Sequence, residues 1–414
     1  RSTLHKQLTV VDKTNGGKAD ALNCAINAAR YPLVCAIDAD TLILPDALLR
    51  LVRPFLTDVD VVAVGGTICL ANGCTIERGT VTRMGLPRSW LARFQVIEYL
   101  RAFLVGRLGW DRLGGNLIIS GAFGLFRRSA VAAAGGYAHD SVGEDMELVA
   151  RLRHQVPAWA QGRAIRHLPD PVAFTEAPET LKILGNQRDR WQRGLADTLW
   201  RHRSIAFRQR YGAVGLVVMP FFILFELFGP VVELFGYGWL AFTALRGTID
   251  PLFAASFFVL AVLIGLLLSL GSILLEQMSL AYYRAPGDLG RLVTVALFEN
   301  VGYRQLILWY RLRGLWGYFR KKKAWGRMVR LGFGPARRKR ERPSAVPALA
   351  AGLAAVVLAL PATWLLKPRP AVNAVLVDRG ADAAPSQPLA WLLSQAKVAP
   401  PVSALVWDPG VDAV

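Results

Sequence analysis

Two adjacent carboxylates, Glu144 and Asp145, follow a glycine-rich stretch and stand where a helical pattern begins. Residues 118–148 run from an apolar, β-type segment through Gly121-Ala-Phe-Gly124 and a Gly-Gly break to these acids. Unpaired N–H groups and the helix dipole favour an ionised acid at a helix N-terminus. Such a carboxylate could act as a general base. On this stretch alone an ordinary cap is the commoner role, so the other motifs decide.

A second pair of carboxylates, Asp38 and Asp40, ends the apolar run 33–37. Such a run is typical of a buried strand, and ligands gather at the C-terminal ends of parallel strands. Carboxylate oxygens there suit Mg²⁺ or Mn²⁺, whose remaining ligands are often phosphate oxygens. The alternative is structural: a turn acid, and an N-cap for the helix expected near Pro45 and Asp46.

Lys18 ends a glycine-containing turn, residues 14–18, between a short β-type run at 8–13 and a helical pattern. Backbone N–H groups at such a turn, together with a lysine, can hold phosphate. The P-loop spacing is absent, and glycine turns are common, so the turn is weak evidence by itself.

Gln187, Arg190 and Trp191 share one face of the helix predicted for residues 180–203, because they stand at i, i+3 and i+4. An amide, a guanidinium and an indole suit a diphosphate or a sugar better than a protein core. Surface salt bridges would account for the neighbouring Arg and Asp residues but would leave an exposed Trp unexplained.

The elements that must position these residues alternate between strand and helix along residues 1–210. Strand-like runs at 33–38 and 59–70 are separated by helical patterns, and residues 88–105 have apolar positions at helical spacing. We expect that last helix to pack on the domain core. The alternation predicts an α/β domain with a mostly parallel sheet, followed by a transmembrane helical region.

The composition of the whole chain is too apolar for an ordinary soluble protein. The whole sequence is 53% hydrophobic and holds 12 Trp, which is unusual for a soluble chain. Residues 213–245 exceed one ordinary span of about 20 residues and predict a broken or tilted helix, or a helix plus a surface segment. Residues 252–275 and 345–366 predict two further spans. Glu226 and Glu233 are expensive in lipid, so we expect them to face protein or a polymer path.

Positive charge is concentrated in residues 311–342, which hold thirteen Lys and Arg against the single acid Glu341, or twelve of the formal net charge of +19. A basic block beside apolar runs is typical of a cytoplasmic segment attracted to anionic lipid. No zinc-finger spacing or aromatic-interleaved motif accompanies it, so no nucleic-acid partner is expected. An even number of crossings must precede a cytoplasmic block. The interrupted apolar run 289–310 then predicts an interfacial or re-entrant element.

Taken together, the motifs resemble those of the membrane-embedded family 2 glycosyltransferases, the group of cellulose, hyaluronan and poly-N-acetylglucosamine synthases. The order and spacing of five motifs agree with that family over about residues 8–310. One such motif alone would mean little, but five in the right order are specific for the family. The matching blocks are Asn15-Gly-Gly-Lys18-Ala-Asp-Ala-Leu-Asn23, Asp38-Ala-Asp40, Ser120-Gly-Ala-Phe-Gly124, Gly143-Glu-Asp145 and Gln187-Arg-Asp-Arg190-Trp191. The resemblance implies a GT-A-like domain that lacks the front strand with which such enzymes begin.

The resemblance also implies a role for each residue. Lys18 would contact the nucleotide-sugar, and Asp38 and Asp40 would bind its diphosphate through Mg²⁺ or Mn²⁺. Asp145 would be the base that deprotonates the acceptor hydroxyl. The other implied contacts are Ser120, Gly121 and Ala122 in the acceptor site, Gln187, Arg190 and Trp191 at the diphosphate, and Trp191 also at the acceptor sugar.

The implied activity is inverting transfer of a sugar from a nucleotide-sugar, by resemblance a UDP-sugar, to a growing polysaccharide. A divalent cation and an arginine would stabilise the leaving diphosphate, and a single base suits in-line displacement. Two alternatives stay open: non-processive transfer to a lipid acceptor, and an inactive or partner membrane subunit of a synthase. Expected partners are the donor, a polysaccharide or glycolipid acceptor, anionic membrane lipid and an accessory export subunit.

The predicted organisation is that of a multi-pass protein of a bacterial plasma membrane with its catalytic domain in the cytoplasm. Its five parts are a glycosyltransferase domain (1–210), transmembrane and interfacial helices (211–310), a basic cytoplasmic segment (311–343), a further transmembrane helix (344–366) and an Ala/Pro-rich tail outside the membrane (367–414).

Overall fold

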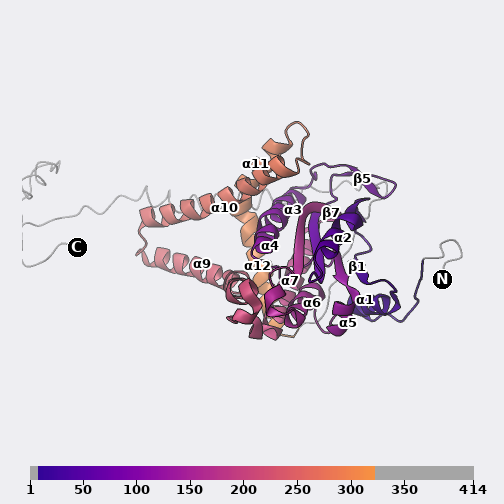
Figure 1. The fold of residues 1–414 in the computed structure, drawn as a ribbon. Coiled ribbons are helices and arrows are strands. Elements are labelled where there is room, and N and C mark those ends of the chain that lie inside the picture. The colour runs from indigo at the N-terminus through magenta and orange to yellow at the C-terminus, as the bar shows by residue number, and fades with distance from the viewer. Residues whose placement is uncertain (1–7, 322–414) are drawn as a thin grey trace, which may run out of the picture. The chain divides into compact units, whose positions relative to one another are not determined.

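The α/β part of the protein is built on a five-stranded sheet with the strand order β1-β6-β3-β7-β2. The computed structural model describes residues 8–321 (Figure 1). The strands of this sheet are β1 (Leu33–Ile37), β2 (Leu42–Ile43), β3 (Ala63–Leu70), β6 (Phe123–Arg127) and β7 (Ile165–Thr175), and a separate hairpin holds β4 (Thr75–Glu77) and β5 (Thr80–Arg83). The stretch 8–16, where a short strand was predicted, has no regular structure.

The sheet is mixed, which corrects the expectation of a mostly parallel one, although the α/β architecture is confirmed. Strand β6 runs antiparallel to both neighbours, β1 and β3, and β2 is antiparallel to β7; β3 and β7 are parallel. A buried strand has the same apolar run in either direction, so its composition does not reveal its orientation. The consequence matters for the site, because the start of β6 lies beside the end of β1: Ile37 is opposite Phe123.

Helices cover both faces of the sheet. Helices α1 (Gly17–Ala28), α5 (Arg128–Ala133) and α6 (Glu144–Gln155) pack on one face, and α2 (Ala47–Thr57) and the π-helix η1 (Arg101–Arg107) pack on the other. Successive strand residues serve opposite cores, as the strand period of two requires. Ala63 belongs to the first core, for example, and Val64 to the second.

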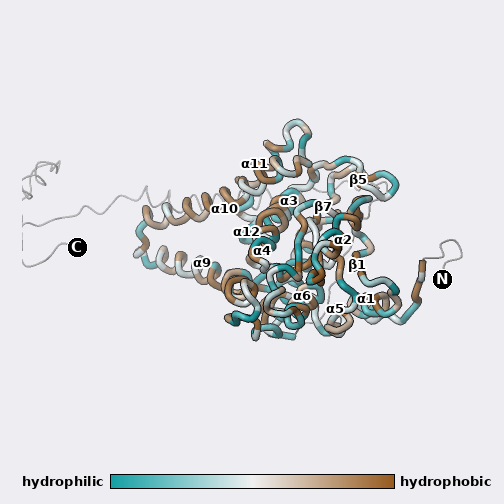
Figure 2. Tube along the Cα trace, viewed as in Figure 1, coloured by the Kyte–Doolittle hydropathy of each residue, from teal (hydrophilic) through white to brown (hydrophobic). Residues whose placement is uncertain are grey.

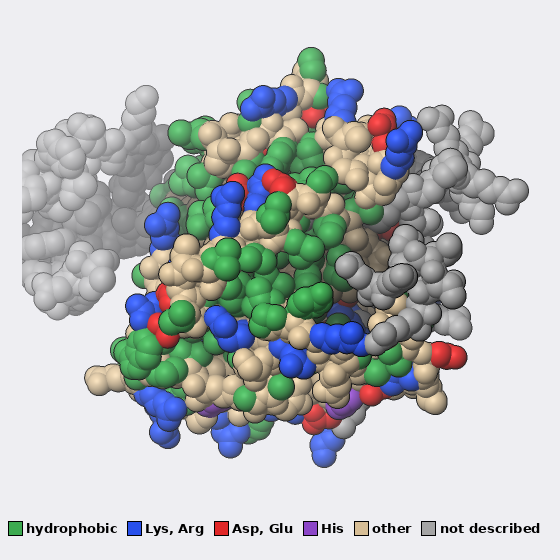
Figure 3. Space-filling view, turned by 45° about the vertical axis from the view of Figure 1, so that its right-hand side comes forward, with side chains coloured by type: hydrophobic (Ala, Val, Ile, Leu, Met, Phe, Trp, Pro, Cys, Tyr) green, Lys and Arg blue, Asp and Glu red, His purple; other side chains and the backbone are tan. Residues whose placement is uncertain are grey.

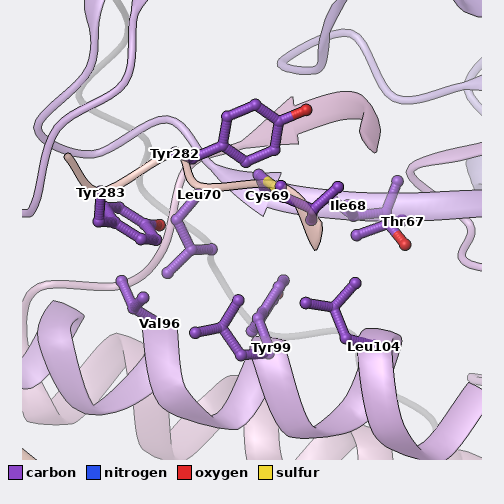
Figure 4. Close-up of a pocket in the computed structure, with 11 residues that line it drawn as sticks. Thr67, Ile68, Cys69, Leu70, Val96, Tyr99, Leu104, Tyr282 and Tyr283 are labelled. Atoms are coloured by element: carbon purple, nitrogen blue, oxygen red, sulfur yellow. The ribbon is translucent and has the colours of Figure 1, made fainter. Parts of the chain in front are cut away.

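The helix predicted at 88–105 is present and lies in the core. It consists of α3 (Trp90–Leu100), η1 and α4 (Leu108–Arg112). Phe94 stacks on Tyr303 with ring centroids 4.6 Å apart. A small cavity of about 10 Å³ remains between α3 and β3; Val96, Tyr99 and Leu104 point into it from the helix side (Figure 4). It has no room for a ligand, so this region is packing.

The remaining described elements follow β7 and lead into an apolar region. They are η2 (Ala158–Ala160), α7 (Leu181–Arg201), η3 (Arg203–Ile205), η4 (Gln209–Tyr211), η5 (Val214–Val218), α8 (Met219–Phe221), η6 (Phe222–Leu227), α9 (Gly229–Arg246), α10 (Pro251–Ser279), α11 (Asp288–Phe298), η7 (Glu299–Tyr303) and α12 (Arg304–Phe319). Among the described residues, one helix, Leu252–Ser279, is long and apolar enough to cross a membrane. A second candidate is the pair Val214–Leu227 and Gly229–Arg246, bent by 41°, which agrees with the predicted broken helix.

Helices α9 and α10 extend away from the α/β part (Figure 1) and are hydrophobic along their lengths (Figure 2). Their exposed side chains are mostly large and apolar. The two acids predicted to need protein partners have them. Glu226 Oε2 lies 3.0 Å from Arg311, and Glu233 Oε1 lies 3.0 Å from Arg304. Residues 322–414, with most of the basic segment, the predicted third span and the tail, lie outside the described residues.

Helices α7 and α12 run side by side in the same direction, because Gly185 lies against Tyr310 and, further along both helices, Gly317 lies against Arg193. Arg313 donates to the carbonyl of Gly185 at 2.7 Å and to Asp189 Oδ2 at 3.1 Å. Arg311 donates to Gln192 Oε1 at 2.9 Å. The first two arginines of the predicted basic block are therefore used inside the fold rather than on a lipid-facing surface.

The start of α6 lies against the middle of α7 at a glycine pair, Gly143 and Gly194. A Cβ placed on Gly194 would be 2.8 Å from the Cα of Gly143, and the reverse substitution would meet Gly194 at the same distance. Real Cβ atoms do not approach backbone so closely, so neither position accepts a side chain without movement. This contact sets the distance between the two helices that carry the predicted functional residues.

We predict that Gly194→Ala destabilises the protein by about 1–3 kcal/mol, because the new methyl group must push α6 from α7. The measurement is the thermal midpoint of the purified protein in detergent. Gly109→Ala in α4 is the matched control, because its Cβ would meet nothing within 4 Å. Replacing Gly by Ala inside a helix stabilises that helix by up to about 1 kcal/mol. Equal midpoints for the two variants would contradict the close packing.

Candidate active site

The ammonium group of Lys18 lies among carboxylates from separate parts of the chain. Its Nζ is 2.6 Å from Asp38 Oδ1 and 3.4 Å from Glu144 Oε1. It also donates to the carbonyl of Gly121 at 3.1 Å. Lys18 is the second residue of α1, whose start is fixed by Asn15 Oδ1 accepting from the N–H of Gly17 at 3.0 Å. The turn predicted from the sequence thus places the lysine in the cluster.

The charge of Lys18 is stabilised by this environment. Burial by itself would lower the pKa of the Lys18 ammonium, because desolvation disfavours the charged form. The nearby carboxylates of Asp38, Glu144 and Asp145 outweigh that cost and raise the pKa above its usual value. The lysine therefore stays a cation and offsets the repulsion among the acids.

Asp145 is held by two backbone N–H groups. Gly121 donates to its Oδ2 at 2.9 Å, and Met146 donates to its Oδ1 at 2.8 Å. The N-cap of α6 is Gly143, and no side chain caps this helix. Asp145 therefore does not have the capping role that was the alternative in the sequence analysis. Asp145 lies in the first turn of α6, and one of its oxygens faces the turn at residues 120–122 that precedes β6, called the β6 turn below. A carboxylate placed this way can accept a proton from a bound hydroxyl.

Gly121 joins the lysine to the acid. A Cβ at this position would lie 3.0 Å from Asp145 Oδ2 and 3.1 Å from Lys18 Nζ. Its carbonyl accepts from Lys18 and its N–H donates to Asp145. Any side chain here would force the two charged groups apart. The residue predicted to line the acceptor site therefore also fixes the charged cluster.

Ser120 and Ala122 complete this turn and attach it to β1. The N–H of Phe123 donates to the carbonyl of Ser120 at 3.1 Å. The N–H of Asp38 donates to the carbonyl of Ala122 at 3.1 Å, and the N–H of Thr41 donates to the carbonyl of Asp38 at 3.0 Å. Asp38 and the half-buried Asp40 thus both lie in the turn that ends β1, as the sequence predicts.

Glu144 belongs to the same cluster, although the sequence indicated only a neighbour of Asp145. Its side chain is 6% exposed and lies 3.4 Å from Lys18. Burial, and then the charge of Asp145, raise the pKa of the Glu144 carboxyl to about 7, against the opposing effects of Lys18 and Arg190. Near neutral pH this acid is therefore partly protonated. Its two-residue motif carried no signal that it would be buried.

The predicted face of α7 reaches the cluster in part. Arg190 acts on the charge of Glu144. Gln187 is buried, and its Oε1 has no hydrogen-bond partner among the described residues. The indole of Trp191 is 44% exposed, with the guanidinium of Arg188 4.3 Å from its ring centroid. The exposed ring and the unpaired amide oxygen leave groups available for a ligand.

Two further residues support the site: Asn23, which ended the first matching block without an assigned role, and Arg107, which the sequence did not single out. The amide of Asn23 on α1 donates to the carbonyl of Tyr137 at 2.9 Å and accepts from the Tyr137 N–H at 2.7 Å. This pair ties α1 to the segment leading into α6. The half-buried Arg107 lies with its guanidinium 4.0 Å from the ring centroid of Phe103. Burial lowers its pKa to about 10 even though Asp145 acts in the opposite direction.

The carboxylates fit a cation shared with a substrate better than a resident one. Within residues 8–321 there is no group of three or more His, Cys, Asp or Glu side chains placed to hold a metal ion. Asp38 and Asp40 provide hard oxygen ligands at one strand end. Mg²⁺ and Mn²⁺ accept such incomplete protein sets when phosphate and water supply the other ligands.

A larger cavity of about 240 Å³ lies beside β1, away from these charges. Its lining is mostly apolar and comes from α1, β1 and α5, with Leu22, Ile26 and Val131 among the contributors. It holds none of the carboxylates described above. The candidate chemistry is therefore in the open charged cluster and not in this cavity.

Comparison with known proteins adds a family. The sequence model of a family described as Glycosyl transferase family group 2 matches residues 33–272. Poly-beta-1,6-N-acetyl-D-glucosamine synthases of Staphylococcus aureus (strain COL) and Staphylococcus epidermidis are 33% and 30% identical over 189 residues. These alignments cover 45% and 46% of this chain and 40% and 41% of those proteins. The matched part thus spans well under half the length of these curated relatives.

One solved structure with a similar fold is a mannosyltransferase from Pyrobaculum calidifontis in complex with GDP-Man and Mn²⁺. The likeness covers 70% of this chain and 69% of that one, with 19% sequence identity and a TM-score of 0.44.

We predict that Glu144→Gln makes stability less sensitive to pH. The native pKa is about 7, whereas an unfolded Glu titrates near ~4.3. Between these values the native state keeps a proton that the unfolded chain releases. Raising the pH through this window therefore lowers the free energy of unfolding of the unaltered protein. The thermal midpoint of the variant minus that of the unaltered protein should therefore be roughly 3–8 °C larger at pH 8 than at pH 5.

The control for this measurement is Glu77→Gln, which removes an exposed carboxyl from β4. Its midpoint should differ from that of the unaltered protein by the same amount at both pH values. If Glu144→Gln also showed a constant difference, the carboxyl would not be protonated near neutral pH.

Proposed function

The chain belongs to glycosyl transferase family group 2, whose model matches more than half of it, and we propose that it transfers a sugar from a nucleotide-sugar to a growing polysaccharide at a bacterial plasma membrane. The observation that carries the proposal is the cluster in which Lys18, Asp38 and Asp145 meet through Gly121. It combines an anion-binding cation, metal-ligating oxygens and an oriented base. Those are the groups that an inverting transfer from a diphosphate leaving group needs.

The donor diphosphate binds at the end of β1 in this proposal. Asp38 and Asp40 would share Mg²⁺ or Mn²⁺ with the phosphate oxygens, and that cation would supply charge stabilisation for the leaving group. Lys18 lies 2.6 Å from Asp38, so its ammonium would be close to a phosphate oxygen bound at that carboxylate. Arg190, which already acts on Glu144, provides a second cation.

The acceptor binds between the β6 turn and the exposed ring of Trp191. A sugar ring packs well on an indole that is partly open to solvent. The buried amide oxygen of Gln187 can accept a hydrogen bond from a substrate hydroxyl, because no described residue uses it. Ser120 and Ala122 line this space from the other side.

Asp145 acts as the general base. The acceptor hydroxyl oxygen forms a bond to the anomeric carbon while the bond from that carbon to the diphosphate oxygen breaks. The hydroxyl proton passes to the carboxylate of Asp145, and the diphosphate leaves with the electron pair. Attack opposite the leaving group inverts the anomeric configuration. The two N–H groups on Asp145 keep it in one orientation before the substrate arrives.

The polymer product and the membrane setting are parts of the proposal. The curated relatives carry the name poly-beta-1,6-N-acetyl-D-glucosamine synthase, so UDP-N-acetylglucosamine is the first donor to test. The bent pair and α10 would cross the bilayer twice and return the chain to the side of the α/β domain. The basic residues that follow would make that side the cytoplasmic one. Transfer of a single sugar to a lipid remains the alternative, and product length separates the two.

We predict that Asp145→Asn lowers sugar transfer by about 10²–10⁴-fold, because an amide cannot accept the proton. The assay is incorporation of radiolabelled sugar by membranes that contain the full chain. Glu77→Gln, which changes an exposed carboxyl on β4 in the same way, should leave the rate unaltered. Undiminished transfer by Asp145→Asn would remove this residue from the mechanism.

We also predict that UDP-sugar binding requires a divalent cation and the carboxylate of Asp38. Binding to the purified chain is measured in detergent with Mn²⁺ and again with a chelator. With Mn²⁺, Asp38→Asn should weaken binding at least tenfold, because the variant loses a ligand of the shared cation. With the chelator it should change binding little, because no cation is bound in either protein. An inactive partner subunit would show no metal-dependent binding in any of these samples.

A further inference from the structure

The end of α7 and the segment that follows it expose aromatic rings and arginines together. Trp200 is 63% exposed and Phe207 is 75% exposed. Arg203, Arg208 and Arg210 are also exposed. The guanidinium of Arg203 lies 4.9 Å from the ring centroid of Trp200. Large exposed aromatic side chains beside polar groups are typical of interaction surfaces rather than of ordinary solvent-facing turns.

The end of α12 has the same character. Trp316 is 60% exposed and Phe319 is 69% exposed. The guanidinium of Arg320 lies 4.9 Å from the ring centroid of Trp316. Because α7 and α12 run side by side in the same direction, their C-terminal ends lie at one end of the pair. We name the exposed residues of these two ends the helix-end surface: Trp200, Arg203, Phe207, Arg208, Arg210, Trp316, Phe319 and Arg320. Figure 3 shows a face of the molecule with Lys and Arg side chains along the lower margin of a broad apolar area.

The segment after α7 is firmly held, so its exposure is not fraying. His202 and Tyr211 are buried beneath it. His154 lies 3.1 Å from His202 and 2.8 Å from the hydroxyl of Tyr211. Phe207 adopts a left-handed backbone conformation with φ of 61°, which is strained for a non-glycine residue. The fold thus keeps a strained residue whose ring points to solvent.

The helix-end surface carries more positive than negative charge. The acids Asp140 and Asp197 lie beside it, and both bind Arg201, at 2.9 and 2.8 Å. Within residues 8–321 no carboxylate forms an ion pair with Arg203, Arg208, Arg210 or Arg320. A partner for this surface must therefore bring negative charge and also accept apolar rings.

We propose that the helix-end surface binds the headgroup layer of anionic phospholipids. Aromatic rings prefer the boundary between headgroups and acyl chains, where one side is apolar and the other is wet. Arginines near an anionic bilayer are attracted to its surface charge. The segment also leads within three residues into the apolar helix that begins at Val214, which places it at the boundary. The inference rests on the membrane location in the proposed function.

The test uses the full chain in nanodiscs that contain either brominated phosphatidylglycerol or brominated phosphatidylcholine. Bromine quenches nearby tryptophan fluorescence, and the signal from Trp200 is obtained as the difference from Trp200→Phe. We expect the anionic lipid to be favoured at Trp200 at least fivefold over the zwitterionic lipid. The triple variant Arg203→Gln, Arg208→Gln, Arg210→Gln should reduce that preference to nearly one.

A matched control removes three exposed arginines elsewhere, Arg78, Arg83 and Arg88, and should keep the preference. Equal quenching by the two lipids, no quenching by either, or an unchanged preference in the triple variant would each overturn the proposal. An acidic protein partner, for example, would leave Trp200 without lipid quenching. Sugar transfer is measured in the same nanodiscs. Loss of lipid preference with transfer intact concerns the surface alone, whereas Asp145→Asn should lose transfer and keep the preference.

Discussion

The structure around the site depends on one constraint: several carboxylates must lie close together in a half-buried place. Glu144 and Asp145 are adjacent in sequence, and Asp38 faces the same space. Like charges at this spacing repel strongly when water is scarce. The ammonium of Lys18 offsets that repulsion, and the raised pKa of Glu144 removes part of the remaining charge near neutral pH. In the proposed function, the substrate would bring a cation and phosphate oxygens to this cluster.

That constraint accounts for features that look unrelated in the sequence. Strand β6 must run antiparallel to β1, because only then does its first turn lie beside Asp38 and present Gly121 between Lys18 and Asp145. The Gly143 and Gly194 pair must be small, because α6 has to carry Asp145 close to the α7 face. Each glycine is fixed by the approach of charged groups or of backbone, and not by the flexibility of a loop.

Some parts of the site could be predicted from the sequence because they depend on local chemistry. The strand that ends at Asp38, the helix that begins beside Asp145 and the shared face of Gln187 and Trp191 follow from apolar periodicity and spacing. Other parts depend on long-range packing. The direction of β6, the burial of Glu144 and the pairing of Arg311 within the fold have no local pattern, since each is decided by which segment lies opposite.

Helix α7 connects the site physically to the apolar part of the chain. Its first half presents Gln187 and Trp191, its middle contacts α6 at Gly194, and its end carries Trp200. Gln192 accepts from Arg311, which also binds Glu226 at 3.0 Å in the apolar helix that follows. A displacement of the apolar helices would therefore act on α7 through the polar contacts of Arg311. In the proposed function, the acceptor face and the α7 part of the helix-end surface belong to the same helix, so a growing polymer would start at a fixed position relative to the bilayer.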